Sequence, residues 1–246
     1  MKTHRHPKRY RQSDRHHRAI SSLSKRLVRV MTYSVLTLLI ISILLVIALR
    51  FLPAPTSAFM MHTHIDDLVE GKAFQPIKQD WVDSRGISKY AYSAVIASED
   101  QRFYQHHGFD IDAIYKAYQQ YQHGGKLRGA STISQQVAKN LFLSPARNFG
   151  RKALEIWFTF LIESLWTKAR ILEMYLNIAE FGDHLFGIEA ASQHYFGISA
   201  KRLSASQAAL LAATLPNPIR LKAAHPSAYL LQRQRWILRQ MHNLAN

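Results

Sequence analysis

The sequence predicts a mainly α-helical protein that carries one N-terminal transmembrane helix. An uncharged run at residues 30–49 follows a strongly basic tail, helix start and stop signals recur through the rest of the chain, and strand patterns are sparse. Hydrophobic residues make up 48% of the 246 residues. This composition is sufficient for a folded core and excludes a disordered chain.

The net charge of +16 is concentrated in residues 1–29, where ten Lys or Arg residues stand against one acidic residue, Asp14. A strongly basic segment indicates an anionic partner, which can be nucleic acid, an acidic membrane surface or a phosphorylated substrate. An apolar run directly follows the tail, so a membrane surface explains the positive charge of the tail. No nucleic-acid partner is therefore expected.

Residues 30–49 are long enough, at 1.5 Å per residue in a helix, to cross a hydrocarbon core of about 30 Å. A buried core helix would rarely stay uncharged on all sides over this length. A cleaved signal peptide competes, because "TSAF" at residues 56–59 offers small residues, but the apolar run and the basic region are both long for a signal. We expect an uncleaved anchor with a cytoplasmic N-terminus and the later residues across the membrane. The absence of cysteine fits an oxidising compartment but carries little weight.

The expected organisation is a basic cytoplasmic tail (1–29), the transmembrane helix (30–49), a linker and membrane-proximal segment (50–74) and one folded domain (75–246). Within the domain, four segments read as helices: "ISQQVAKNLFL", "ALEIWFTFLIESLW", "ARILEMYLNIAEF" ending at Gly182, and "SASQAALLAATL" ending at Pro216. Thr132 with Gln135 has the spacing of a capping box, as does Ser204 with Gln207. These polar residues can therefore be helix starts and nothing more.

The segment "HGGKLRGAST", residues 123–132, contains three glycines and two cations and leads into a helix N-terminus. Such a loop can surround an anion, but a plain surface loop is an equal alternative. On the helix that follows, Gln135, Gln136 and Lys139 share a face, which is either solvated or directed at a ligand.

The next helix carries one polar stripe, formed by Arg151, Glu155, Thr159 and Glu163, on an otherwise apolar surface. We expect this helix to be buried on most sides. Glu155 then either forms an ordinary ion pair with Arg151, one turn away, or lines a cleft.

Two further polar patterns leave alternatives open or carry no site. Glu173, Asn177 and Glu180 form a stripe that is either solvated or supports a neighbouring site. Histidine pairs such as His62 with His64 and His106 with His107 indicate metal only weakly, because no carboxylate or cysteine completes a ligand set near them. No structural zinc is expected.

Five segments together resemble, in order and spacing, the five motifs of the family 51 glycosyltransferases that polymerise peptidoglycan. They are "SEDQRFYQHHGFD", "GASTISQQVAKN", "RKALE", "RILEMYLNIAEFG" and "GIEAASQHYFG". The resemblance extends from about residue 75 to the C-terminus and includes "LPNPIR" and "WILRQM". It implies a lysozyme-like, mainly helical domain with a membrane-proximal apolar face.

The resemblance implies that the chain joins lipid II units with inversion, forming β-1,4 glycan strands and releasing undecaprenyl pyrophosphate for cell wall synthesis at the inner membrane. It makes Glu99 the base that accepts the proton of the incoming hydroxyl. The other matching positions are Asp100, Phe103 and His106 around that base, Thr132 and Gln136 as polar contacts, Lys139, Arg151 and Lys152 as cations near the pyrophosphate, and Glu155 as the second carboxylate.

The implied partners are lipid II, the growing glycan chain and membrane lipid, with division or envelope proteins as further candidates. No cofactor and no protein-bound metal are expected, although the resemblance leaves a divalent cation such as Mg2+ at the pyrophosphate open. Glu155 is usually assigned to orienting the cations or such a metal.

A transpeptidase domain would need Ser-x-x-Lys and Lys-Thr-Gly motifs. "SLSK" at residues 22–25 lies in the tail and Lys-Thr-Gly does not occur, so we expect no transpeptidase activity. One alternative is a lysozyme-like hydrolase or lytic transglycosylase acting on finished glycan, but three cations suit a pyrophosphate leaving group better than a sugar oxygen. The other alternative is an inert membrane-anchored scaffold.

Overall fold

A computed structural model describes residues 9–125, 131–146 and 148–245. The chain divides into two compact units, residues 1–47 and 48–246. Helices dominate the described residues and the strands are short, which confirms the predicted mainly helical fold class. The predicted boundaries of linker and domain stay predictions.

Helix α1 runs from Arg9 to Phe51. Its Lys25–Phe51 part reaches a mean hydropathy of 2.6 and is long and apolar enough to cross a membrane, by length and composition. Only 6% of its most apolar window is buried, unlike the core helix of a soluble protein. The predicted span of residues 30–49 lies inside this segment, which fits a membrane anchor.

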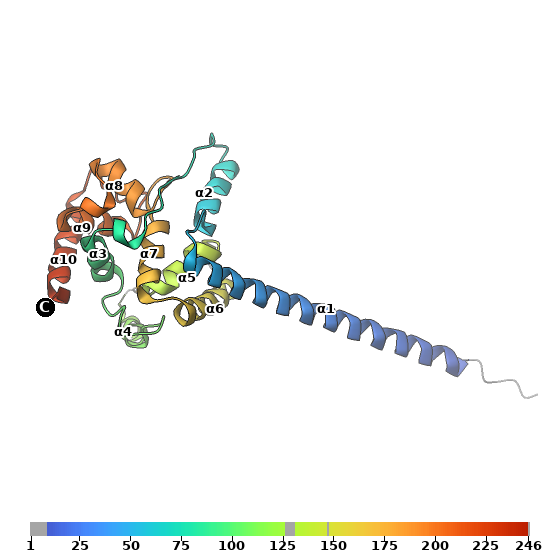
Figure 1. The fold of residues 1–246 in the computed structure, drawn as a ribbon. Coiled ribbons are helices and arrows are strands. Elements are labelled where there is room, and N and C mark those ends of the chain that lie inside the picture. The colour runs from blue at the N-terminus through green and yellow to red at the C-terminus, as the bar shows by residue number, and fades with distance from the viewer. Residues whose placement is uncertain (1–8, 126–130, 147, 246) are drawn as a thin grey trace, which may run out of the picture. The chain divides into compact units, whose positions relative to one another are not determined.

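The second unit is a helical domain in which α5 packs against α6 and α7, while α3, α9 and α10 form a second group (Figure 1). Helix α2 contacts α5. The helices are α2 (Ala58–Val69), α3 (Lys89–Glu99), α4 (Ile111–Gln122), α5 (Ile133–Phe142), α6 (Phe149–Leu165), α7 (Lys168–Ile178), α8 (Ile188–Phe196), α9 (Ala205–Thr214) and α10 (Ala228–Ala245), with 3-10 turns η1 (Ser84–Gly86) and η2 (Ala200–Arg202).

A small sheet joins segments that are far apart in the sequence. Strands β1 (Lys78–Gln79), β2 (Glu180–Gly182) and β3 (Leu185–Phe186) lie in the order β1-β3-β2. The first pair is parallel and the second is antiparallel. Phe181 and Phe186 are fully buried, so the sheet is part of the domain core.

Both predicted capping boxes are confirmed. The hydroxyl of Thr132 accepts the N–H of Gln135 while the Gln135 side chain accepts the N–H of Thr132, at the start of α5. Ser204 and Gln207 form the same pair at the start of α9. Each pair satisfies backbone donors that a helix start would otherwise leave free.

The predicted helix "ARILEMYLNIAEF" is too long at its C-terminal end. Helix α7 ends at Ile178, because Ala179 adopts an extended conformation and Glu180 begins β2. Glu180 therefore leaves the predicted stripe. Asn177 is fully buried and pairs with both backbone groups of Val82 at 2.9 Å, so it supports the fold rather than facing solvent.

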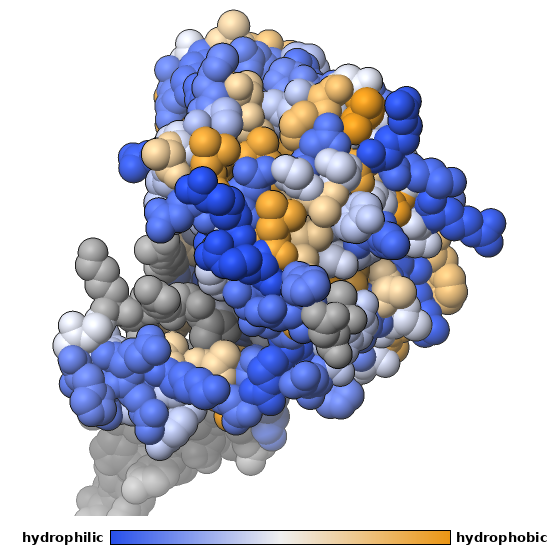
Figure 2. Space-filling view, turned by 90° about the vertical axis from the view of Figure 1, so that its left-hand side faces the viewer, coloured by the Kyte–Doolittle hydropathy of each residue, from blue (hydrophilic) through white to orange (hydrophobic). Residues whose placement is uncertain are grey.

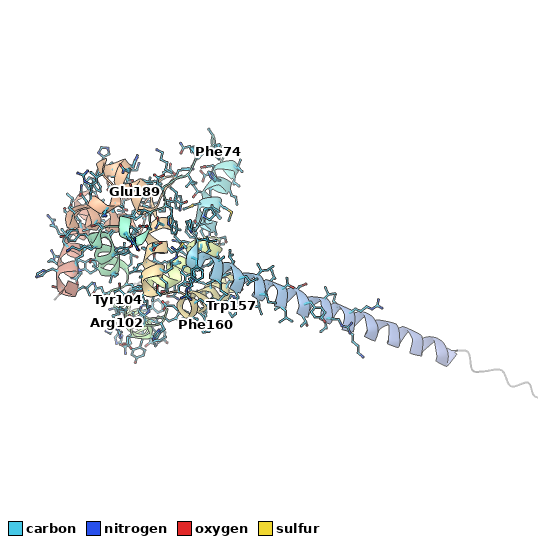
Figure 3. All side chains as sticks on the ribbon, in the orientation of Figure 1. Phe74, Arg102, Tyr104, Trp157, Phe160 and Glu189 are labelled. Carbon is cyan, nitrogen blue, oxygen red and sulfur yellow. The ribbon has the colours of Figure 1, made fainter. Side chains whose placement is uncertain are left out.

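The expectation that α6 is buried on most sides is also wrong. Leu154, Ile156 and Phe160 are 51%, 48% and 58% exposed, whereas Glu155 and Thr159 are buried. The helix thus directs part of its polar stripe into the domain and an apolar face outward, on the side where Figure 3 labels Phe160. On the face shown in Figure 2, by contrast, apolar residues are interspersed with polar ones.

Candidate functional site

Glu99, the last residue of α3, lies where α3, α5 and α10 meet. One carboxylate oxygen accepts a hydrogen bond from the Gln136 amide at 3.1 Å, and the other lies 3.3 Å from the Arg233 guanidinium. The Glu99 side chain is 14% exposed. A carboxylate that is fixed in this way and still reached by solvent can accept a proton from a hydroxyl bound beside it.

Asp100 connects the end of α3 to the start of α5. Its carboxylate accepts the N–H of Ile133 at 3.0 Å and lies 2.9 Å from His106 Nε2. His106 Nδ1 accepts the N–H of Gly108, which leaves the proton of a neutral ring on Nε2, facing Asp100. Thr132 donates to the Gly108 carbonyl at 2.6 Å. These residues position the helix ends around the base and are themselves mostly buried.

Phe103 is fully buried, and the ammonium group of Lys168 lies 4.4 Å from the centre of its ring. Close by, Gly108 has a φ of +87°, and a Cβ there would lie 2.9 Å from the side chains of Thr159 and Glu163. Both the backbone conformation and the space therefore require glycine. Phe103 and Gly108 shape the segment after α3 by packing.

A pocket of about 340 Å³ lies between α5 and the start of α6. It is lined by Phe59, Ser131, Gln135, Gln136, Lys139, Pro145, Arg151, Lys152 and Glu155. Arg151 lies 2.8 Å from one oxygen of Glu155, and Lys152 contacts the other. Three cations against one carboxylate leave an excess of positive charge. We call this the cation pocket.

Two features indicate that the cation pocket is suited to an anion. Burial lowers the pKa of Lys139, Glu155 partly offsets this, and Arg151 lowers it further. An anion bound beside Lys139 would reverse that effect, because it favours the charged ammonium. In addition, Arg151 Nε is buried and has no hydrogen-bond partner among the described residues.

A second pocket, of about 260 Å³, contains Glu99 and Asp100, and we call it the base pocket. Ser131 lines both pockets. Gln136 lines the cation pocket and donates to Glu99. The two pockets are therefore neighbours across the first turn of α5. Residues 126–130 of the glycine-containing loop, for which anion binding and a plain surface loop were equal alternatives, lie outside the described part of the chain.

Eight of the ten site residues predicted from the sequence line one of the two pockets. The other two line neither: His106 contacts Asp100 of the base pocket, and Phe103 is fully buried and packs edge-on against His106. Sequence reasoning missed three others: Arg233, which contacts Glu99; Tyr175, which donates to Gln136 at 3.1 Å; and Phe59, whose ring centre lies 5.0 Å from the Lys139 ammonium. Arg233 is 134 positions from Glu99 and sits among other cations on α10. No local pattern identifies such a residue.

One expectation about histidine is wrong. A carboxylate does complete a potential ligand set, because His64, Asp67 and His184 bring their ligand atoms within 4.8 Å of one another. Asp67 follows His64 on α2, but His184 comes from the turn between β2 and β3, far along the chain. The absence of a structural zinc stays a prediction, which we reconsider below.

Comparison with known proteins identifies the family. The sequence model of the family described as Transglycosylase matches residues 67–242. A biosynthetic peptidoglycan transglycosylase from Chromohalobacter salexigens is 50% identical over 220 residues, which cover 89% of this chain and 94% of that protein. Proteins of the same name from Pasteurella multocida and Ectopseudomonas mendocina are 55% identical over 196 residues and 49% identical over 225 residues. The match to the Pasteurella multocida protein covers 80% of this chain and 80% of that protein. The match to the Ectopseudomonas mendocina protein covers 92% of this chain and 91% of that protein. With a positioned carboxylate beside a pocket of cations, this chain belongs to the transglycosylase family.

Proposed function

We propose that this protein polymerises lipid II into β-1,4 glycan strands and releases undecaprenyl pyrophosphate. The observation that carries the proposal is the placement of Glu99 beside a pocket lined by Lys139, Arg151 and Lys152. An inverting displacement of pyrophosphate needs a base for the attacking hydroxyl and cations for the leaving group. The base pocket supplies the base, and the neighbouring cation pocket supplies the cations.

Glu99 takes the proton of the 4-hydroxyl of the incoming disaccharide as that oxygen attacks the anomeric carbon of the growing chain. The anomeric carbon–oxygen bond breaks at the same time, and the electron pair leaves on the pyrophosphate. Gln136 and Arg233 hold the two oxygens of Glu99 in place during this step. Because the pyrophosphate leaves as an anion, no general acid is needed.

Lys139, Arg151 and Lys152 stabilise the departing pyrophosphate. Glu155 accepts from both Arg151 and Lys152, so it orients their donors toward the pocket. A planar guanidinium suits two phosphate oxygens at once, whereas an ammonium acts as a point charge. The protein offers a poor ligand set for Mg2+ here, because Glu155 is a single carboxylate whose oxygens both already accept from cations. The mechanism therefore uses the cations alone.

We propose that the reaction takes place at the inner membrane, with the domain in the periplasm, and the apolar part of α1 supports this as a membrane anchor. The basic residues precede the apolar part of α1, which by the positive-inside rule favours a cytoplasmic N-terminus. The exposed apolar face of α6 follows Arg151 and Lys152 directly in the sequence. A lipid-linked substrate could thus keep its chain in the membrane while its pyrophosphate meets the cations.

The test uses the full chain in detergent with labelled lipid II, and resolves the products by length. We expect labelled polymer to lengthen with time. A hydrolase or lytic enzyme would instead shorten finished glycan, and an inert scaffold would change neither substrate. Either of those results, obtained with well-folded protein, would refute the proposed activity. Cleavage of the anchored protein by a protease added from the periplasmic side tests the orientation.

A further inference from the structure

A cluster of two histidines and two carboxylates lies outside the polymerisation site, between α2 and the sheet. His64 and Asp67 come from α2, and Asp183 and His184 form the turn between β2 and β3. Ligand atoms of His64, Asp67 and His184 lie within 4.8 Å of one another. The mechanism proposed above uses none of these residues.

The His64 ring presents an unused nitrogen. Its Nδ1 is buried and has no hydrogen-bond partner among the described residues, whereas the ring stacks on Phe74 with centroids 5.0 Å apart (Figure 3 labels Phe74). A buried polar atom without a partner carries a desolvation cost, so its presence in a folded protein needs an explanation. A bound ion is one such explanation. A metal ion bound at Nδ1 would remove that cost.

His184 is held in a conformation that directs its ring into the cluster. Its φ is +54°, and no other non-glycine residue in the described part of the chain has a positive φ. Its carbonyl accepts the N–H of Lys78 at 2.8 Å, which fixes the turn to β1. A strained backbone that its surroundings hold in place is typical of functional positions.

The two nitrogens of His184 face two carboxylates. Nδ1 lies 2.9 Å from Asp183 and Nε2 lies 2.6 Å from Asp67, which is itself buried. Histidine ligands of metals commonly donate one ring N–H to a carboxylate while the other nitrogen binds the ion. Asp183 fits the first role. Asp67 and His184 Nε2 pair with each other at 2.6 Å, and a metal bound between them would replace that contact.

We propose that His64 Nδ1, Asp67 and His184 Nε2 bind Zn2+, with Asp183 positioning the His184 ring. Two imidazoles and a carboxylate suit zinc, and their oxygen and nitrogen atoms at about 2.0 to 2.2 Å from the ion would stand about 3.3 Å apart in tetrahedral geometry. The Asp67–His184 pair must open slightly and His64 must move closer, both within reach of side-chain rotation.

Solvent can supply the fourth ligand, because Asp67 and His184 also line a pocket of about 340 Å³. That pocket provides an entry path for the ion. The bound ion would link the C-terminal part of α2 to the β2–β3 turn. Helix α2 also carries Phe59, which lies against Lys139 of the cation pocket. The proposal concerns binding of the ion and does not depend on the proposed polymerase activity.

The experiment titrates Zn2+ into the metal-stripped full chain in detergent, by calorimetry and by thermal unfolding. We expect one site whose occupation raises the Tm. His64→Gln removes one ligand and leaves the Asp67–His184 pair in place, and it should weaken zinc binding at least about 100-fold. Asp183→Asn removes a contact to a ligand and should weaken it about 10- to 100-fold.

The matched control is His194→Gln, which makes the same change at an exposed histidine on α8 and should leave zinc binding unchanged. Mg2+ should not raise the Tm, because it prefers oxygen ligands. The histidines of the N-terminal tail are present in every variant and cannot produce a difference. Equal zinc affinity in His64→Gln and the unaltered protein, or no zinc-dependent rise in Tm, would overturn the proposal.

Discussion

The base pocket and the cation pocket each contain a carboxylate with a role in the proposed mechanism, Glu99 and Glu155, and the surroundings of these two side chains are opposite. Glu99 accepts from a neutral amide and lies at the edge of hydrogen-bond range from one guanidinium, with a side chain 14% exposed. Glu155 is held by Arg151 and Lys152, and its side chain is 4% exposed. The first can exchange a proton with a bound substrate. The second is a counter-ion, so one residue type serves two roles through its environment.

The largest effect is expected from Glu99→Gln. The amide keeps the size of the side chain but cannot accept the proton of the attacking hydroxyl, so lipid II turnover should fall at least about 100-fold. The Tm should change little. Glu70→Gln, at an exposed carboxylate after α2, is the matched control and should keep full turnover. Retention of more than about a tenth of the turnover by Glu99→Gln would remove the residue from the base role.

Glu155→Gln should affect stability as well as turnover. Without the carboxylate, Arg151 and Lys152 repel each other beside a neutral side chain, and we expect the free energy of unfolding to fall by roughly 1 to 3 kcal/mol. Turnover should fall at least about tenfold because the cations lose their orientation. Denaturant unfolding and the lipid II assay measure the two effects. An effect on turnover as large as that of Glu99→Gln, with unchanged stability, would make Glu155 a second base.

Lys139→Met should separate function from stability. Turnover should fall at least about tenfold, because the ammonium contributes more than about 1.4 kcal/mol to the leaving group. Burial lowers the pKa of Lys139 below its ordinary 10.5, so the charge opposes folding at neutral pH, and this cost fades as pH rises toward 10.5.

The Tm of Lys139→Met should therefore equal or exceed that of the unaltered chain at pH 7, with a smaller difference near pH 10. The control is Lys116→Met, at an exposed lysine on α4, which should change neither quantity. A clear loss of Tm at pH 7 in Lys139→Met would show that the ammonium stabilises the free protein, contrary to a pocket held ready for an anion.

The smallest effect is expected from Tyr175→Phe. The hydroxyl of this buried residue donates to Gln136, which in turn donates to Glu99. Its loss should lower kcat by about two- to fivefold and the free energy of unfolding by about 1 kcal/mol, as for one buried hydrogen bond. KM should stay constant, because the change acts on the base and not on the pyrophosphate. A rise in KM with constant kcat would place Tyr175 in substrate binding instead.

Local patterns predicted the helix starts well and the inward-facing groups less well. Thr132 and Gln135 satisfy each other within one turn, so their capping box is readable from four residues. The sequence did not predict which face of α6 is buried. Glu155 is buried because of its contacts with cations and the packing of α6 on α5, whereas the apolar face of α6 is exposed. Hydrophobic periodicity indicates amphipathicity but not which side meets the domain when the outer side fits a membrane.

Contacts made across the whole chain were beyond sequence reasoning for a different reason. Arg233 reaches Glu99 because α10 packs on α3, and the turn between β2 and β3 brings His184 to Asp67 on α2. In both cases an ionisable residue looks like ordinary surface in the sequence, because its partner comes close only in the tertiary fold. The resemblance to a family supplied the ten site residues, but not these supporting contacts.

The division of labour between the two pockets is tested most directly by pyrophosphate binding, measured by calorimetry in metal-free buffer with the full chain. Inorganic pyrophosphate should bind Glu99→Gln within about threefold of the unaltered protein, since the cation pocket is intact. Arg151→Ala should bind it at least about tenfold more weakly, because a charged two-pronged donor is lost. Equal weakening by both substitutions, or unchanged affinity in Arg151→Ala, would contradict the account.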